Sequence, residues 1–341
     1  FNYNSSINSS ITKSIKISEK KSQQSDNNMN TCFIGAGNFS SRFLMPLFKK
    51  NGFIMHTVIS NNGISSKRVA DKFGFKNISS DLISTLKNKE INNVIISTPH
   101  NLHSKQLIEC FKNNKMNVYI DKPLAINLEE LNDLKNEFQK YKLLNSNILV
   151  GFNRKFSPHV LKLKEHLKKF NSPMFINMNI NAGTIPKDHW INNKKIGGGR
   201  LIGEGCHFID LACHLIDSKV VSSSIKEFKT SKIIESESFT ISLVFNDSSI
   251  ANINYLANGS KSYTKEKIEI FCNGSNYIIN DFKKLEIFGD NTLNNMNLFF
   301  QDKGIDNTIK FFKSMIEGKS FYSFEEQIEV SELIINFSNK L

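Results

Sequence analysis

The residues best suited to chemistry follow a run of three glycines in the second half of the chain. After residues 197–199 come Glu204, His207 and Asp210, at the start of an apolar, helix-like pattern. Glycine lets the backbone turn sharply or approach a ligand closely. An imidazole can move a proton near neutral pH. The segment therefore predicts a substrate site at the N-terminus of a helix.

A second glycine pattern lies far upstream, where an apolar run at 31–35 leads into Gly35, Gly37 and Ser40. In a dinucleotide site the first glycine permits a tight turn and the second lets the backbone approach the pyrophosphate. The small third residue allows close packing of helix and strand. An ordinary glycine turn is the competing interpretation. The expected cofactor contacts are Gly35, Gly37, Asn38, Phe39, Ser40, Ser60, Asn61, Thr98, Pro99, His103, Asp121 and Lys122.

The identity of the dinucleotide depends on the end of the second predicted strand. Sites that prefer NAD usually place a carboxylate there, on the ribose hydroxyl. No carboxylate occurs between residues 49 and 70, whereas Ser60, Asn61, Lys67 and Arg68 are available. This favours NADP slightly over NAD, although Lys67 and Arg68 are equally well explained as solvated helix charges.

The strand and helix patterns around these motifs predict an α/β protein with two domains. Residues 30–150 alternate strand and helix patterns, which predicts a Rossmann domain with a doubly wound parallel sheet. Residues 151–341 contain period-two strands near 239–245 and 250–255, which predict an α+β domain with a large open antiparallel sheet. Residues 1–29 are rich in Ser, Asn, Lys and Gln, so they are expected to form a disordered tail or linker.

The composition excludes several classes of protein. The net charge is +12, but the lysines are scattered and form no stripe interleaved with aromatic residues, so nucleic-acid binding is not expected. No apolar run approaches the length of about 18 residues that a membrane helix needs. The five cysteines are odd in number and form no CxxC pair, which is typical of reduced thiols in a cytoplasmic protein.

A zinc site at the same helix is an alternative interpretation. His207, Asp210 and His214 would share one helical face, and imidazole and carboxylate groups can bind zinc. The spacing matches no recognised zinc pattern, so we expect no metal.

The strand ending in Asp121, Lys122 and Pro123 resembles a family motif. Together with the Thr98-Pro99-x-x-x-His103 segment and the later glycine-rich segment, it resembles the glucose–fructose oxidoreductase / inositol dehydrogenase / MocA family (Gfo/Idh/MocA). The resemblance covers about residues 30–340. It implies a Rossmann domain, a second domain with an open antiparallel sheet, and oxidation or reduction of sugar hydroxyl carbons with NAD(P). It also implies a homo-oligomer assembled through the open sheet.

Further motifs at 151–158, 181–186, 188–190 and 203–210 look like one branch, the bi-domain oxidoreductases of polysaccharide gene clusters. In that branch a zinc-type alcohol dehydrogenase module precedes this one. The resemblance therefore implies an upstream module in a longer chain and a role in polysaccharide biosynthesis.

Carried over by position, Lys122 matches the family's catalytic lysine and His207 its acid–base histidine. An ammonium beside the reacting hydroxyl would stabilise a developing alkoxide, and the imidazole would take the proton. The family's aspartate four residues before the histidine is Gly203 here. Either Glu204 supplies the carboxylate from a shifted position, or the histidine works without one. Asp210 is expected to orient the helix or to fix a nitrogen of the histidine.

Arginine is scarce in this chain, and Arg154 and Arg200 both fall within the motifs, where they suit phosphate or carboxylate recognition. Trp190 could stack on a sugar face, with plain packing as the alternative. The expected substrate-binding residues are Lys122, Arg154, His189, Trp190, Arg200, Glu204 and His207.

Three functions compete. The first is an NAD(P)-dependent oxidoreductase acting on a sugar or nucleotide sugar. The second is a non-catalytic dinucleotide-binding or regulatory module, to which the missing aspartate gives some weight. The third is NAD-dependent glycoside cleavage, which is known within the family.

Overall fold

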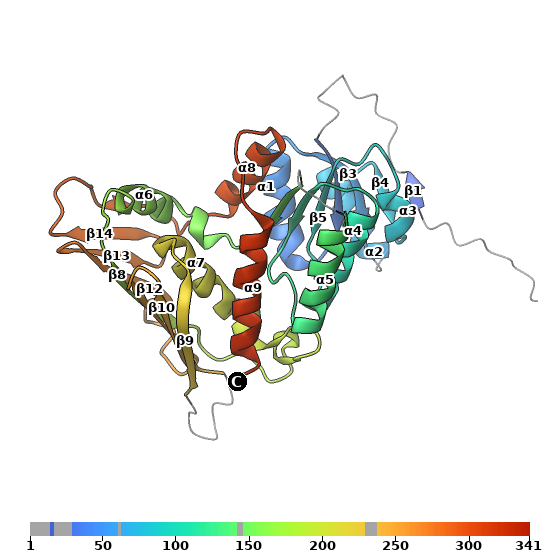
Figure 1. The fold of residues 1–341 in the computed structure, drawn as a ribbon. Helices are drawn as coiled ribbons and strands as arrows, with labels where there is room; N and C mark the ends of the chain where they lie inside the picture. The colour runs from blue at the N-terminus through green and yellow to red at the C-terminus, as the bar shows by residue number, and fades with distance from the viewer. Residues whose placement is uncertain (1–13, 17–28, 61–62, 142–145, 229–236) are drawn as a thin grey trace, which may run out of the picture.

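The computed structural model of the chain describes residues 14–16, 29–60, 63–141, 146–228 and 237–341. Two sheets lie on opposite sides of the molecule, with helices between them (Figure 1). Within the described residues, no helix combines the length and apolar character needed to cross a bilayer.

The first sheet contains six parallel strands, each formed by an apolar run between turn residues. They are β2 (Asn30–Ile34), β3 (Ile54–Ile59), β4 (Asn77–Ser79), β5 (Asn93–Ile96), β6 (Asn117–Ile120) and β7 (Asn147–Val150). The spatial order β4-β3-β2-β5-β6-β7 reverses direction at β2, which confirms the predicted Rossmann sheet. Because helices cover both faces, its central strands are buried almost continuously.

The connections of this sheet are helical: α1 (Met45–Lys50), α2 (Gly63–Phe73), α3 (Leu82–Leu86), α4 (His103–Lys112) and α5 (Leu128–Tyr141). A seventh strand, β1 (Ser14–Lys16), pairs antiparallel with β4 at the sheet edge. It falls inside the segment predicted to be a tail. Apart from Met29, the rest of that segment lies outside the described residues.

The second sheet has eight strands in the order β15-β14-β13-β12-β8-β11-β10-β9. Their bounds are β8 (Met174–Asn181), β9 (Val220–Glu227), β10 (Phe239–Phe245), β11 (Ile250–Leu256), β12 (Glu266–Cys272), β13 (Ser275–Asn280), β14 (Lys284–Phe288) and β15 (Met296–Asn297). All pairs are antiparallel except β8 with β11, which is parallel. Alternate residues are buried, as the period-two pattern predicted, on the face toward α6 (Pro158–Leu167) and α7 (Cys206–Ile216).

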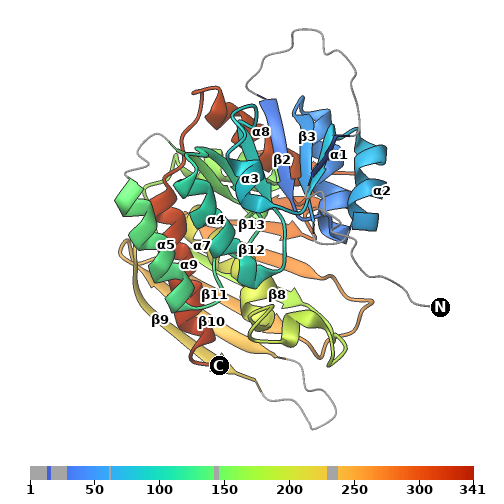
Figure 2. The same cartoon turned by 90° about the vertical axis from the view of Figure 1, so that its right-hand side faces the viewer.

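The last two helices return to the Rossmann domain. α8 (Ile305–Ile316) contributes Phe312 to the core formed around Phe48 and Tyr119. α9 (Phe324–Ser338) lies beside α5, and its Gln327 hydrogen-bonds the backbone of β7 at Ile148 and Val150 (Figure 2). The predicted second domain of residues 151–341 therefore contains two helices that complete the first domain, a long-range contact that periodicity does not reveal.

We expect Phe312→Ala to lower the free energy of unfolding by about 3–5 kcal/mol, the usual cost of removing a buried aromatic ring. Phe312 is fully buried and its ring lies 5.9 Å from that of Tyr119 and 6.1 Å from that of Phe53. Phe321→Ala is the matched control because that ring is 75% exposed. Urea unfolding measures both; equal losses would contradict the return of α8 to the Rossmann core.

Candidate active site

The turn after β2 is built so that only glycine fits at its first position. Gly35 has φ +107°, and a Cβ there would lie 2.2 Å from the carbonyl oxygen of Ser97. At Gly37 a Cβ would meet nothing within 4 Å, and the carbonyl oxygen of Gly37 accepts the first helical hydrogen bond from Ser41. Asn38 and Phe39 are exposed. The turn thus leaves open space at the N-terminus of a helix, as a pyrophosphate requires.

Ser40, the small third residue of the pattern, is buried beneath that turn. Ser60 follows β3 and donates its backbone N–H to Ser79. Asn61 lies outside the described residues. Lys67 and Arg68 are exposed on α2.

The loop after β5 is tied to the loop after β6 by a buried histidine. One ring nitrogen of His103 lies 2.9 Å from the carbonyl oxygen of Thr98, and the other lies 2.7 Å from that of Pro123. The ring is fully buried, so His103 positions the loops rather than contacting a ligand itself. Pro99 is exposed and Thr98 half-buried at the same strand end.

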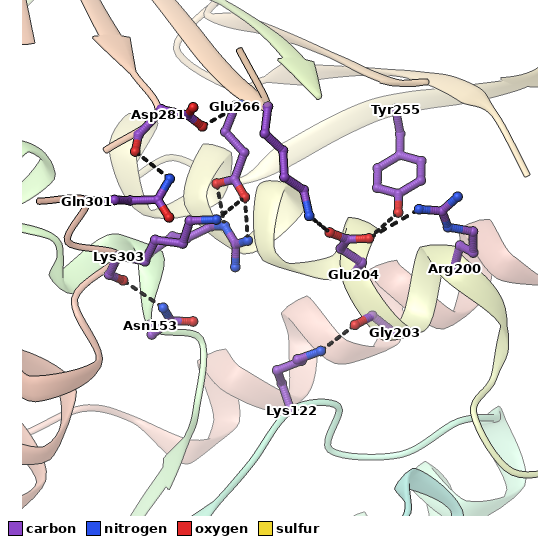
Figure 3. Close-up of polar contacts among 12 residues, drawn as sticks. Lys122, Asn153, Arg200, Gly203, Glu204, Tyr255, Glu266, Asp281, Gln301 and Lys303 are labelled. Atoms are coloured by element: carbon purple, nitrogen blue, oxygen red, sulfur yellow. Dashed lines mark hydrogen bonds and ion pairs between the residues drawn. The ribbon is translucent and has the colours of Figure 1, made fainter. Parts of the chain in front are cut away.

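Lys122 stands directly after β6 and reaches across to the other domain. Its ammonium donates a hydrogen bond to the carbonyl oxygen of Gly203 (Figure 3). The preceding residue, Asp121, donates its backbone N–H to Ile96. Burial raises the pKa of the Asp121 carboxyl to about 6, although Lys122 opposes the shift.

His207 lies in the first turn of α7 and is 6% exposed. Within the described part of the chain its Nδ1 has no hydrogen-bond partner. Burial lowers the pKa of His207 well below its usual value, and Arg154 and Lys122 lower it further. The imidazole is therefore neutral at pH 7 and can accept a proton.

Asp210, one turn along α7, does not hold His207. Its carboxylate lies 2.9 Å from the ammonium of Lys155, which also donates to the hydroxyl of Tyr322. Of the two tasks expected for Asp210, this contact supports the orientation of the helix. Burial raises the pKa of Asp210 more than Lys155 lowers it.

The structure distinguishes the two alternatives for the missing aspartate, in which Glu204 supplies the carboxylate or His207 works without one. A Cβ at Gly203 would lie 2.3 Å from Cδ1 of Ile191, so this isoleucine fills the space of a larger residue. Glu204 instead accepts hydrogen bonds from Lys265 and Tyr255 and pairs with Arg200. Burial alone would raise the pKa of Glu204, but these partners lower it to about 2. The geometry favours the alternative in which His207 works without a carboxylate.

Both arginines expected to bind the substrate are already engaged. The guanidinium of Arg154 donates two hydrogen bonds, of 3.0 and 2.8 Å, to Glu266. Arg200 is 1% exposed and donates to the carbonyl oxygen of Gly183 as well as to Glu204. Each guanidinium is thus held by protein acceptors, and contact of either arginine with a substrate stays a prediction.

His189 and Trp190 lie on a loop of the second domain that contacts the end of β5. The ring of Trp190 meets that of His100 edge-on at 4.6 Å, and His100 in turn contacts the carbonyl oxygen of Gly197. Burial, followed by Lys122, lowers the pKa of His100 to about 3. Trp190 remains 44% exposed, so it packs on His100 and still presents part of its indole.

Three residues that the sequence analysis missed join this site. Glu266, the first residue of β12, is fully buried and binds Arg154 and Lys303, while Lys265 binds Glu204 (Figure 3). The sequence did not single out Lys265 and Lys303, because the chain contains many lysines. Glu266 did carry a signal, because it shares the buried face of a period-two strand with Ile268 and Ile270.

A metal site was not expected, and the described residues contain no group of three or more His, Cys, Asp or Glu side chains arranged to hold a metal ion.

The two glycines of the turn should respond differently to substitution. Gly35→Ala should destabilise the protein, because its Cβ would overlap the backbone of Ser97 and the residue has a positive φ. Gly37→Ala should leave the melting temperature almost unchanged but weaken dinucleotide binding by closing the approach to the helix. Thermal melts and calorimetric titration with NADH measure the two effects. Unchanged affinity in Gly37→Ala would contradict the site.

The buried carboxylate of Glu266 makes stability depend on pH. Burial alone would raise its pKa, but Arg154 and Lys303 lower it from 4.5 to about 2. The stabilisation is therefore complete above pH 4.5 and is lost as the pH falls from there toward 2. A shift of this size corresponds to about 3 kcal/mol.

We expect Glu266→Gln to destabilise the protein by about 3–5 kcal/mol at pH 7, because Arg154 would remain buried without its partner. The variant should also lose this part of the pH dependence. Glu269→Gln, on the opposite face of β12, is the control and should cost less than about 1 kcal/mol. Urea unfolding between pH 7 and pH 3 tests this, and parallel curves for the wild type and Glu266→Gln would refute it.

Comparison with known proteins agrees with this geometry. Residues 29–148 match the Gfo/Idh/MocA family, described as an oxidoreductase family with an NAD-binding Rossmann fold. A 4-carboxy-2-hydroxymuconate-6-semialdehyde dehydrogenase from Sphingobium sp. is 29% identical over 38% of this chain and 40% of its own length. Myo-inositol 2-dehydrogenase from Thermotoga maritima is 24% identical over 45% of each chain. The match thus spans less than half the length of either relative.

The fold is shared over a longer stretch. A levoglucosan dehydrogenase solved with NADH and levoglucosan superposes with a TM-score of 0.76 at 19% identity, covering 92% of this chain and 98% of the other. The family match, the strand order around β2 and the glycine turn agree with one another. These comparisons support the Gfo/Idh/MocA family, an oxidoreductase family with an NAD-binding Rossmann fold, whose model matches residues 29–148 of the chain.

Proposed function

We propose that this protein is an NAD(P)-dependent oxidoreductase that transfers a hydride between nicotinamide and a hydroxyl-bearing carbon of a sugar or nucleotide sugar. One observation carries the proposal. The ammonium of Lys122, from the Rossmann domain, binds the carbonyl oxygen of Gly203, four residues before His207 in the other domain. The same ammonium acts electrostatically on the His207 ring.

The dinucleotide would be held by the turn from Gly35 to Ser40 and by the loops after β5 and β6. The open space at Gly37 and the exposed residues Asn38 and Phe39 fit a pyrophosphate. When bound, the nicotinamide supplies the hydride donor or acceptor. The exposed Lys67 and Arg68 and the missing carboxylate after β3 favour NADP over NAD.

Lys122 and His207 divide the proton chemistry. In the oxidising direction, His207 accepts the hydroxyl proton, for which its neutral form is required. Lys122 exchanges its hydrogen bond with Gly203 for one to the substrate oxygen, and its charge stabilises the developing alkoxide. Asp210 keeps α7 in place through Lys155.

The names of relatives and neighbours support a small polyol or sugar-like substrate, since they include myo-inositol and levoglucosan dehydrogenases. The motif resemblance extends the proposal to polysaccharide biosynthesis in the cytoplasm, in a homo-oligomer, with an upstream zinc-type alcohol dehydrogenase module. These parts remain predictions.

We expect Lys122→Met and His207→Ala each to reduce turnover by about 10²-fold or more, the usual contribution of a positioned acid or base. Affinity for NADH should change little, because neither side chain forms the pyrophosphate turn. Lys105→Met, at an exposed position on α4, is the control. Turnover is followed by the absorbance of reduced nicotinamide across a panel of sugars.

The same assay separates the three functions. Near-normal turnover in either variant would refute the role of that residue. Tight binding of NADH with no turnover of any sugar, unaltered by Lys122→Met, would identify a regulatory module. Product release without a net change in reduced cofactor would identify glycoside cleavage.

A further inference from the structure

We propose that the substrate carries an oxyanion, a carboxylate or a phosphate, and that Lys265 and Lys303 hold this group beside the carbon served by His207. This inference rests on the hydride transfer proposed above and names the chemical class of its substrate.

The charged groups with the largest effect on the pKa of the His207 imidazole are cations. The four charged groups that act most strongly on His207 are Arg154, Lys122, Lys303 and Lys265, in that order. They come from four separate parts of the chain, in both domains. Even with the two ionised carboxylates Glu204 and Glu266 beside them, these four cations leave a net positive charge, which is electrostatically complementary to an anion.

Two carboxylates of the site, Glu204 and Glu266, form ion pairs with three of these cations. Glu266 binds Arg154 and Lys303, and Glu204 binds Lys265. Neither carboxylate is among the four strongest influences on His207, although each touches a cation that is. Each carboxylate therefore holds its cations in place, while the side chains of Lys303 and Lys265 stay partly exposed.

Both carboxylates are also fixed in the ionised form, since their partners lower the pKa of each to about 2. They serve as anchors for the cations and take up no proton near neutral pH. A lysine ammonium has three N–H donors. Within the described structure, Lys303 and Lys265 each use one donor for a carboxylate at 2.7 Å, which leaves two donors on each.

Lys303 is held in place before any ligand binds. Asn153 donates a hydrogen bond of 2.7 Å to its carbonyl oxygen, and Gln301 donates one of 2.7 Å to that of Asp281 (Figure 3). The side chains of Lys303 and Lys265 are 22% and 43% exposed, so a ligand can reach both. Arg154 donates two hydrogen bonds to Glu266, the carboxylate that also binds Lys303. Little ordering is therefore left to oppose the binding of an anion.

An anion held here would also assist the reaction. Negative charge near His207 stabilises the imidazolium that forms when the ring accepts a proton. No protein carboxylate contacts the ring in the described residues, and the position of the family's aspartate is Gly203. The substrate would thus bring the charge that the protein does not provide.

The test is calorimetric titration of the NADH-loaded protein with D-glucose, D-glucuronate, glucose 6-phosphate and UDP-glucose. We expect at least one charged probe to bind about tenfold more tightly than glucose, with an affinity that falls as salt is added. Tightest binding of glucuronate assigns a carboxylate. Tightest binding of a phosphate probe assigns a phosphate.

Lys303→Met and Lys265→Met should each remove most of this preference, whereas Lys261→Met, at an exposed position outside the cluster, should retain it. Of the two variants, Lys265→Met is expected to disturb folding less, because the Lys265 side chain is the more exposed. Thermal melts and NADH affinity check that each variant is folded.

Two results would overturn the proposal: charged probes that bind no more tightly than glucose, or a preference that survives both substitutions. A different result would reject the hydride-transfer function. Anion binding at Lys265 and Lys303 with no turnover of any sugar would leave the oxyanion site standing and reject the reaction. Turnover of uncharged sugars with no preference for anions would support the hydride-transfer function and reject the oxyanion site.

Discussion

The hydrogen bond between the ammonium of Lys122 and the carbonyl oxygen of Gly203 is the contact on which the site depends. It joins the end of a parallel strand to the start of a helix in the other domain. The bond places a cation and a neutral imidazole in one electrostatic environment, because His207 follows Gly203 by one helical turn. If the two sheets were displaced relative to each other, each residue would keep its local structure but the pair would be lost.

That contact is maintained by a scaffold that crosses the domain boundary. α8 supplies Phe312 to the Rossmann core, and α9 binds the backbone of β7 through Gln327. The loop that carries Trp190 packs on His100, at the end of β5. The chain therefore returns to the Rossmann domain after the second sheet, and contacts of α8, α9 and the Trp190 loop join the two domains.

Glycine at position 203 fits the arrangement of the whole site. Ile191 lies where a Cβ at position 203 would be, the Gly203 carbonyl accepts a hydrogen bond from Lys122, and Glu204 binds Lys265, Tyr255 and Arg200. His207 is left among cations, with its Nδ1 unpartnered within the described residues.

The sequence by itself determined the two kinds of sheet and the glycine turn, because these follow from periodicity and backbone sterics. It also offered Lys122 and His207 as candidates, because the motifs around them resemble those of a known family. It could not show that Arg154 and Arg200 are buried against acceptors, that His103 ties two loops, or that Lys265, Glu266 and Lys303 join the site. Those facts depend on pairs of residues far apart in the chain. Only the tertiary structure decides them, since the partner of a charged side chain is set by packing and not by local sequence.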